Sequence, residues 1–247
     1  YVNGKEACFW PFGYNSFHCN VTELLNENGK NNVLSVRLEN KPQSSRWYPG
    51  AGLYRNVRVV TTDRIYVPVW GTQLTTPHVS SEYASVRLRT EIANAGENNI
   101  RVVTEIVSPD GKVVAVKDNT GKINHGRPFE YITRFGIRSI EIVADKGFFL
   151  NGKHRKFQGV CNHHDLGPLG AAVNVAALRR QLTLLKDMGC DAVRTSHNMP
   201  APELVELCDE MGFMMMIEPF DEWDIAKCEN GYHRYFGEWA ERDMVNM

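Results

Sequence analysis

Residues 191–218 read DAVRTSHNMPAPELVELCDEMGFMMMIE, and this stretch decides the fold. A strand-like segment, 191–195, is followed by a helical segment, 202–211, which has a proline near its first turn and a glycine just past its end. The next segment, 213–217, is a continuous apolar run, as expected for a strand buried on both faces. This strand–helix–strand order with short connections predicts parallel strands joined by a right-handed crossover.

The preceding residues extend the same pattern toward the N-terminus. Residues 156–160 form a predicted strand that ends at the polar run 161–165, CNHHD. Apolar residues then recur at steps of four, three and three, on one face of a helix that Gly189 ends. These residues are Leu178, Leu182, Leu185 and Met188. The order from 156 to 218 is therefore βαβαβ.

Polar side chains repeatedly follow the predicted strands of this region. In a β/α barrel the carboxyl ends of the strands form the face on which active sites are built. An open doubly wound sheet would also bind ligands there, but the sequence carries no GxGxxG or P-loop motif. A barrel takes about 250 residues, so residues 151–247 hold roughly the first three βα units.

The first 143 residues are rich in short strand-like segments instead. Residues 32–39 (NVLSVRLE) alternate apolar and polar side chains as a half-buried strand does. Two further segments, 101–107 and 112–116, flank the turn sequence SPDG and predict a hairpin. With another alternating strand around Val86 and Leu88, these features predict a small β-sandwich.

Composition excludes several classes of protein. The chain has 28 Lys and Arg against 29 Asp and Glu, which is unlike the basic surplus of a nucleic-acid-binding protein. No apolar stretch is long enough to read as a transmembrane helix. Six cysteines are scattered without zinc-ligand spacing, and we expect reduced, mostly buried thiols.

Several motifs occur along nearly the whole chain in an order typical of one enzyme family. They are GYNSF (13–17), NVL (32–34), SRWYPGAGLYR (45–55), TRFGIR (133–138), NGK (151–153), GV (159–160), HHD (163–165), VRTSHNMP (193–200) and CDEMG (208–212). Together they resemble family 2 glycoside hydrolases, most closely the bacterial β-galactosidases, with β-glucuronidases and β-mannosidases as near relatives.

The resemblance implies a multidomain fold in three parts. Residues 1–64 would be the C-terminal part of a jelly-roll sugar-binding β-sandwich, and 65–143 an immunoglobulin-like β-sandwich. Residues 144–247 would be the first βα units of a (β/α)8 TIM barrel. The family usually carries a longer segment between Asp118 and Thr133. We therefore expect that a loop is missing there and that the residue numbers continue across the gap. Trp47 and Tyr48 are expected to pack at the domain junction.

The implied activity is that of a retaining exo-glycosidase acting on terminal β-D-galactosides. Such an enzyme uses two glutamates about 5–5.5 Å apart, one as acid/base and one as nucleophile. Neither matches a position in this sequence, so we assign no catalytic residue here, expect both glutamates beyond Met247, and expect the chain alone to be inactive. The chain requires no cofactor, although a divalent or monovalent cation is compatible with the intact enzyme. The expected partner is a carbohydrate substrate, with no nucleic acid and no membrane, and a homo-oligomer and a bacterial cytoplasmic or periplasmic location stay open.

The resemblance also implies roles for polar residues at the strand ends. Asp165 matches the position where the family holds a sugar hydroxyl, and His197 matches a histidine that lines the sugar pocket. Asn198 follows His197, and Trp223 would either stack on a sugar face or belong to the core. The residues expected to support these contacts are His163, His164, Arg194 and Glu218.

Three alternatives stay open from the residues themselves. Without the family, Glu218 together with Asp221 or Glu222 would be the acid/base pair. A metal hydrolase would use the histidines at 163, 164 and 197, but their spacing is poor for a metal site and we expect no metal. A non-catalytic carbohydrate-binding or scaffolding protein built from β-sandwiches is the third alternative.

Strand alternation also predicts Arg194 and Ser196 on one face, with His197 on the other.

Overall fold

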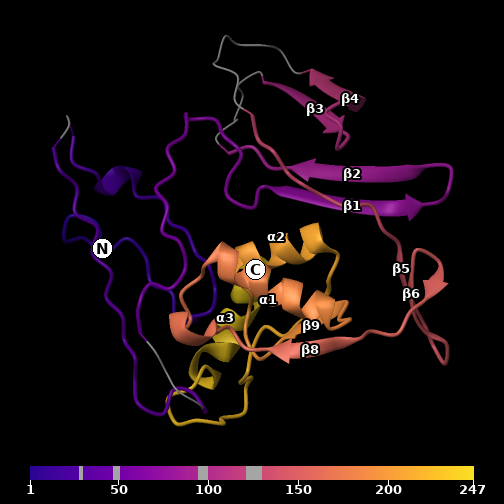
Figure 1. Ribbon diagram of the computed structural model, residues 1–247. Helices are drawn as coiled ribbons and strands as arrows, with labels where there is room; N and C mark the ends of the chain where they lie inside the picture. Colours follow the sequence, from indigo (N-terminus) through magenta and orange to yellow (C-terminus); the bar gives the residue numbers. More distant parts are fainter. Residues whose placement is uncertain (28–29, 47–50, 94–99, 121–129) are drawn as a thin grey trace. The chain divides into compact units, whose positions relative to one another are not determined.

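The computed structural model describes residues 1–27, 30–46, 51–93, 100–120 and 130–247 (Figure 1). The chain divides into two compact units, and the first is discontinuous because it combines residues 1–58 with residues 155–247. Residues 59–154 form the second unit. The division into 1–64, 65–143 and 144–247 stays a prediction.

The second unit consists of antiparallel hairpins. Its strands are β1 (Thr72–Val79), β2 (Ala84–Thr90), β3 (Arg101–Val107), β4 (Val113–Thr120), β5 (Ile140–Val143), β6 (Gly147–Leu150) and β7 (Lys153–His154). β1 pairs with β2, β3 with β4, and β6 with both β5 and β7. The hairpin predicted around SPDG is confirmed, with the Gly111 amide donating to the Ser108 carbonyl at 2.9 Å. The immunoglobulin-like sandwich stays a prediction.

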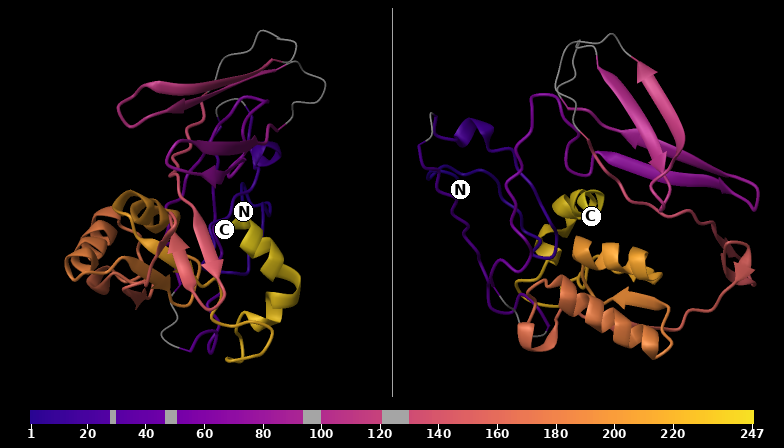
Figure 2. Two further views of the ribbon diagram at one scale, coloured as in Figure 1. Left: turned by 90° about the vertical axis from the view of Figure 1, so that its right-hand side faces the viewer. Right: turned by 45° about the horizontal axis from the view of Figure 1, so that its top comes forward.

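The first unit contains the predicted parallel strands. Its regular elements are η1 (Thr22–Leu24), β8 (Gly159–Asn162), η2 (Gly167–Leu169), α1 (Val175–Asp187), β9 (Ala192–Thr195), α2 (Pro202–Met211), β10 (Met214–Ile217) and α3 (His233–Asn246). The sheet order is β10-β9-β8, and both pairs are parallel. The βαβαβ prediction is thereby confirmed. Figure 2 shows α1 and α2 next to one another, with α3 on a separate side.

Local signals explain where α1 and α2 begin and end. The Asn174 side chain accepts a hydrogen bond from the Ala177 amide at 3.0 Å and so caps the start of α1. Helix α2 begins at Pro202, whose missing amide hydrogen costs nothing in a first turn. It ends at Gly212, which adopts the left-handed conformation with φ +76°.

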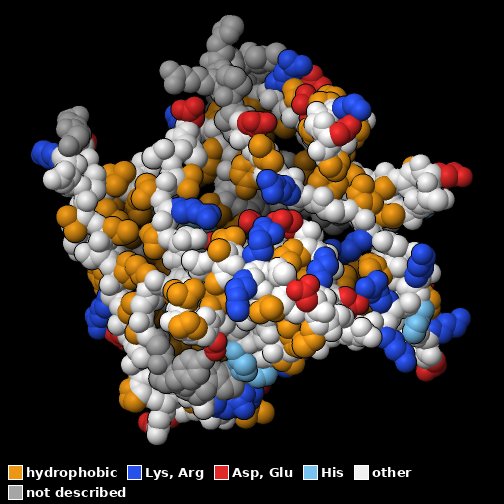
Figure 3. Space-filling model, in the orientation of Figure 1, with side chains coloured by type: hydrophobic (Ala, Val, Ile, Leu, Met, Phe, Trp, Pro, Cys, Tyr) orange, Lys and Arg blue, Asp and Glu red, His pale blue; other side chains and the backbone are white. Residues whose placement is uncertain are grey.

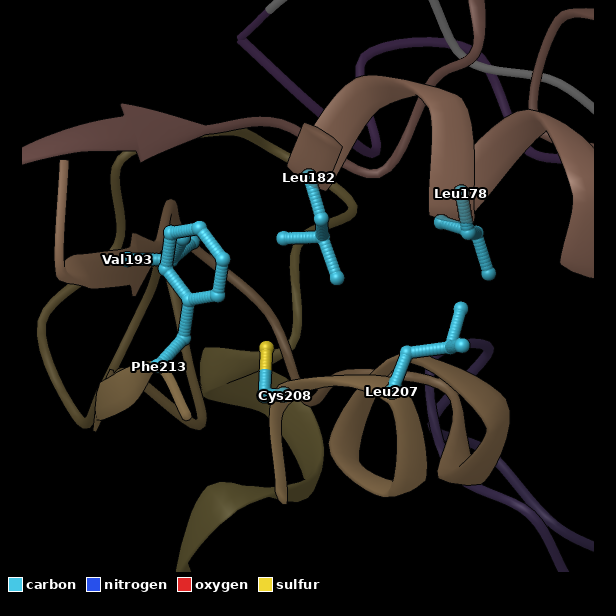
Figure 4. Close-up of a cluster of buried hydrophobic side chains, with 6 residues drawn as sticks. All are labelled: Leu178, Leu182, Val193, Leu207, Cys208 and Phe213. Carbon is cyan, nitrogen blue, oxygen red and sulfur yellow. The ribbon is translucent and has the colours of Figure 1, made fainter. Parts of the chain in front are cut away.

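The side chains of α1 and α2 meet in a core cluster with the sheet (Figure 4). Leu178 and Leu182 extend from α1 toward Leu207 on α2, while Val193 of β9 and Phe213 close the other end (Figure 4). Burying each of these side chains contributes roughly 1.5–3 kcal/mol. The apolar face predicted for the first helix is confirmed at Leu178 and Leu182, but Met188 is its exposed C-terminal cap.

The prediction that 213–217 is buried on both faces is wrong for its last residues. Met216 is 63% exposed and Ile217 36% exposed. The physical reason is that β10 lies at the edge of the sheet, since β9 is its partner on one side and the described residues supply no strand on the other. A continuous apolar run therefore identified the strand but not its neighbours.

The strand predicted at 32–39 is also wrong. Within the described part of residues 1–58, Leu34 makes one isolated antiparallel bridge with Val2, and no continuous ladder extends from it. Val33, Val36 and Leu38 are exposed accordingly. Figure 3 shows the resulting hydrophobic surface over the region where the N-terminal backbone runs. A strand needs a partner to satisfy its backbone groups, which an alternating pattern alone does not provide.

Residues 10–17 pack against α3 through a second cluster. Phe12 is buried with Met199 and Phe220, and its ring lies 4.5 Å from that of Tyr232. Asp243 of α3 is fully buried and accepts hydrogen bonds from Trp10 Nε1 at 2.7 Å and from Asn15 Nδ2 at 3.0 Å. The Tyr232 hydroxyl also donates to Asp243. The start of the chain is therefore part of the same unit as its last helix.

Three further expectations have different outcomes. All six cysteines are reduced, but Cys208 is the only one buried, so the prediction of mostly buried thiols is wrong. Trp47 and Tyr48 lie outside the described residues, as does most of the segment expected to lack a loop, at 121–129. Across the described residues, no helix combines the length and the apolar character needed to span a bilayer.

Candidate functional site

The polar residues predicted to gather at the strand ends belong to three successive connections. His163, His164 and Asp165 follow β8, His197 and Asn198 follow β9, and Glu218 follows β10. Because the strands are parallel and adjacent, their carboxyl ends lie along one edge of the sheet. The prediction that these polar residues follow the carboxyl ends of parallel strands is confirmed.

Glu218 is the centre of the contacts at this edge. One carboxylate oxygen lies 2.8 Å from His197 Nδ1, and the other forms an ion pair with the Arg194 guanidinium. The Glu218 amide donates to the Thr195 hydroxyl at 3.1 Å, which fixes the backbone of β10 relative to β9. This arrangement orients the His197 ring, because a carboxylate on Nδ1 leaves Nε2 to face another group.

Arg194 lies on the same side as His197, contrary to the predicted alternation. Its guanidinium is 3.3 Å from His197 Nδ1 and 3.4 Å from the Ser196 hydroxyl. Arg194 and Ser196 share a face as predicted, but the placement of His197 on the other face is wrong. The reason is that β9 ends at Thr195, and a two-residue alternation does not extend past the end of a strand. Arg194 also donates to Cys161 Sγ at 3.3 Å, and this hydrogen bond lowers the pKa of the Cys161 thiol below its usual value.

The HHD run after β8 separates into three different environments. His163 is exposed, and its ring meets that of His197 edge-on at 5.6 Å. His164 packs against Tyr14, with ring centroids 4.6 Å apart. Burial lowers the pKa of His164 below its usual 6.5, although the charge of Asp165 opposes this shift. Asp165 Oδ1 accepts from the Gly167 amide at 3.3 Å, which shapes its own loop.

Asn198 lies between two small cavities. One cavity of about 60 Å³ is bounded by Asn198, Phe12, Tyr14 and Asp221, among others, and a second of about 40 Å³ is bounded by Asn198 and the HHD run. Asn198 is 6% exposed, and its Nδ2 atom has no hydrogen-bond partner within the described part of the chain. A buried amide donor without a partner is costly, so it indicates a position for water or a ligand oxygen.

Asp221 and Glu222 are held by neighbouring groups. Asp221 forms a two-pronged ion pair with Arg46, and Arg46 Nε lies 3.1 Å from Asp221 Oδ2. Glu222 is buried and accepts hydrogen bonds from the backbone amides of Lys227, Cys228 and His233. These contacts favour structural roles for both carboxylates.

Arg46 and Tyr14 are two residues of this site that the sequence analysis did not predict. Both come from residues 1–58 and reach the loops after β10 and β8, respectively. Arg46 lies in the SRW motif that carried part of the resemblance, and this motif was the available signal. No local periodicity can place a side chain against a loop 175 residues away.

Trp223 is the last of the predicted site residues, and the predicted absence of a metal site concerns the histidines. Trp223 is 55% exposed, and its ring lies 5.8 Å from that of Phe236, so it is a partly covered surface residue rather than core. Groups of three or more His, Cys, Asp or Glu that could hold a metal ion are absent from the described ranges.

Comparison with known proteins shows to which family the chain is related. The family model "Glycosyl hydrolases family 2, TIM barrel domain" matches residues 141–238. A β-galactosidase of Bacteroides ovatus is 40% identical over 99% of this chain, which covers 33% of that protein. The chain belongs to glycoside hydrolase family 2. Its parallel strands and helices are accordingly part of a family 2 TIM barrel.

Other family 2 proteins match over most of the chain. The crystal structure of a family 2 glycosyl hydrolase from Bacteroides cellulosilyticus has a TM-score of 0.88 and 30% identity, and the match covers all of this chain and 37% of that one. A β-glucuronidase of Bacteroides fragilis is 26% identical over 89% of this chain and 39% of its own length. This family 2 chain thus spans about a third of the length of these relatives.

Proposed function

We propose that the whole protein is a retaining exo-glycosidase that hydrolyses terminal β-D-galactosides, with a carbohydrate as its partner. The 40% identical relative, which is named as a β-galactosidase, supports galactose over glucuronic acid. The polar groups at the carboxyl ends of β8, β9 and β10 support a sugar-binding role for this part of the barrel.

The unpartnered amide of Asn198 is the observation that carries the proposal. In the proposed complex, Asn198 Nδ2 donates to a hydroxyl oxygen of the sugar, and Asp165 accepts from a neighbouring hydroxyl. Glu218 and Arg194 hold the His197 ring so that its Nε2 atom faces the sugar. Trp223, half exposed beside this edge, offers an aromatic face for the apolar side of the ring.

The catalytic pair is proposed to lie outside these 247 residues. Retention requires two carboxyl groups about 5–5.5 Å apart, one of which is a free nucleophile. Here Glu218 is paired with Arg194, Asp221 with Arg46, and Glu222 with backbone amides. These three carboxylates are thus already engaged, so we assign them supporting roles and do not propose them as the acid/base pair.

A substrate panel tests the proposal. The whole protein is assayed with chromogenic β-galactoside, β-glucuronide and β-mannoside, and the configuration of the first product is followed by NMR. We expect fastest turnover of the β-galactoside with a β-configured initial product. Preference for the glucuronide or mannoside would assign the protein to a neighbouring specificity. Glycan binding without turnover of any substrate would instead favour the non-catalytic alternative.

The Asn198→Asp variant tests the sugar contact directly. It keeps the shape of the side chain but replaces the Nδ2 donor by an oxygen. We expect kcat/KM to fall roughly 10- to 100-fold, the range for losing a hydrogen bond to a buried polar group. Asn119→Asp, at an exposed position on β4, is the matched control and should leave kcat/KM unchanged. Equal activity of Asn198→Asp and the unchanged protein would contradict this role.

A further inference from the structure

Four buried polar atoms without hydrogen-bond partners belong to residues that line one cavity. It is the cavity of about 40 Å³ bounded by residues 54–55, the loops after β8 and β9, and part of α1. Within the described part of the chain, the atoms without a partner are Arg55 Nε, Asn162 Nδ2, His164 Nδ1 and Asn198 Nδ2. Native proteins leave few buried polar atoms unsatisfied, so four of them around one cavity indicate a bound group.

The chemistry of these atoms selects an acceptor. Arg55 Nε and the two asparagine Nδ2 atoms can only donate hydrogen bonds. Burial lowers the pKa of His164 below its usual 6.5, so its ring is neutral at pH 7, and the tautomer with the proton on Nδ1 is a fourth donor. Asn198 Nδ2 carries two hydrogens, which leaves one for this cavity besides the one proposed for the sugar.

Arg55 also brings a positive charge that has only neutral partners. Its Nη1 atom donates to the Ser16 hydroxyl at 3.1 Å, and its Nη2 atom donates to the Met199 carbonyl at 2.8 Å. The guanidinium lies 5.4 Å from the centre of the Tyr54 ring. Among the described residues, no ion pair includes Arg55. A partly buried cation without a counter-charge favours an anion over water, because buried charges are normally paired.

The size of the cavity limits this anion. One ordered water needs about 10–15 Å³, so a cavity of about 40 Å³ has room for about three waters or one small ion, and a sugar ring does not fit. Asp165 is the one carboxylate among the described lining residues, and its Oδ1 atom accepts from the Gly167 amide at 3.3 Å. Its charge opposes an anion, whereas Arg55 and three neutral donors favour one.

We propose that this cavity binds one small monovalent anion of the size of chloride. Arg55 supplies the positive charge, and Asn162, His164 and Asn198 supply the neutral donors. Because Arg55 belongs to residues 1–58 and the other donors lie at the ends of β8 and β9, the anion connects the N-terminal segment to two loops of the barrel. The inference goes beyond the proposed function and does not depend on it.

Crystals of the whole protein grown with sodium bromide test the site directly. Bromide replaces chloride in such sites and is located by its anomalous scattering. We expect one anomalous peak in the cavity, within hydrogen-bond distance of Arg55 Nε and Asn162 Nδ2. Electron density for water at this position, without an anomalous signal, would overturn the proposal.

Thermal unfolding of the whole protein tests the site in solution. The unfolding midpoint should rise saturably with chloride, by roughly 2–5 °C at ten times the dissociation constant. Gluconate at the same ionic strength is too large for the cavity and should cause no such rise. Asn162→Asp replaces a donor by a carboxylate and should abolish the effect of chloride, whereas Asn40→Asp, at an exposed position of the same unit, should retain it. Equal responses to chloride and gluconate, or an unchanged chloride response of Asn162→Asp, would contradict the proposal.

Discussion

Glu222 shows how one carboxylate can organise a loop. Its oxygens accept from the amides of Lys227, Cys228 and His233, and its ion pair with His233 has an N–O distance of 3.2 Å. Burial acts to raise the pKa of Glu222, but these donors outweigh it, and the pKa lies below the usual 4.5. The ionised form therefore stabilises the folded state.

The ionisation of Glu222 predicts how the stability of the protein depends on pH. Because the folded pKa of Glu222 is depressed, its contribution is fully present above about pH 4.5 and is lost as the pH falls through the lower folded value. Glu222→Gln should cost about 1.5–3 kcal/mol at pH 7 and flatten the loss of stability below pH 4.5. Thermal unfolding from pH 3 to 7 measures both effects. Glu206→Gln, exposed on α2, should change neither, and an unaltered acid profile for Glu222→Gln would refute the assignment.

At the scale of elements, the connection between β10 and α3 depends on one close approach. A Cβ atom placed on Gly231 would lie 1.7 Å from Glu222 Oε2 and 2.5 Å from its carboxyl carbon. The absence of a side chain at Gly231 thus permits the carboxylate to reach its three amide donors. The glycine is required for space, and this requirement fixes how the loop enters α3.

Gly231→Ala and Gly237→Ala should therefore have opposite effects. The first forces Glu222 away from its donors and should destabilise the protein by roughly 1–3 kcal/mol. The second lies within α3 with nothing near its added methyl group, and should stabilise by roughly 0.5–1 kcal/mol through helix propensity. Denaturant unfolding distinguishes the two signs. Two equal shifts would mean that Gly231 is not sterically constrained.

At the scale of the whole molecule, the first unit is held together by contacts between the two ends of the chain. The Trp10 and Asp243 side chains are hydrogen-bonded although 233 residues separate them. Asn246 also donates to the Ser16 carbonyl and to Asn15 Oδ1. The barrel strands and the N-terminal segment are consequently one structural unit, into which residues 59–154 are inserted.

Asp243→Asn tests this connection. The substitution removes the charge that accepts from Trp10, Asn15 and Tyr232, and should cost about 2–4 kcal/mol. Hydrogen exchange should accelerate both in α3 and in residues 10–16. The control Asp209→Asn, at an exposed position on α2, should leave both segments protected. Faster exchange confined to α3 would mean that the N-terminal segment is held by other contacts.

The sequence predicted those features that depend on neighbouring residues. The bounds of α2 match the prediction because Pro202 and Gly212 punctuate it locally, and the parallel order follows from the short connections. The edge position of β10 and the unpaired segment around Leu34 were missed, because both depend on which strands lie alongside. In the site, the contact of His197 with Glu218 follows from adjacent strand ends, whereas Arg46 and Tyr14 arrive from a distant segment.

The separation of Trp10 from Asp243 also means that these two residues are synthesised at different times. A ribosome adds about 5–20 residues per second, so a separation of 233 residues delays the arrival of Asp243 by roughly 10–50 s. Throughout that interval Phe9, Trp10 and Phe12 have no α3 to pack against. The aromatic side chains of residues 9–12 therefore stay without these partners on the nascent chain until translation reaches the last helix.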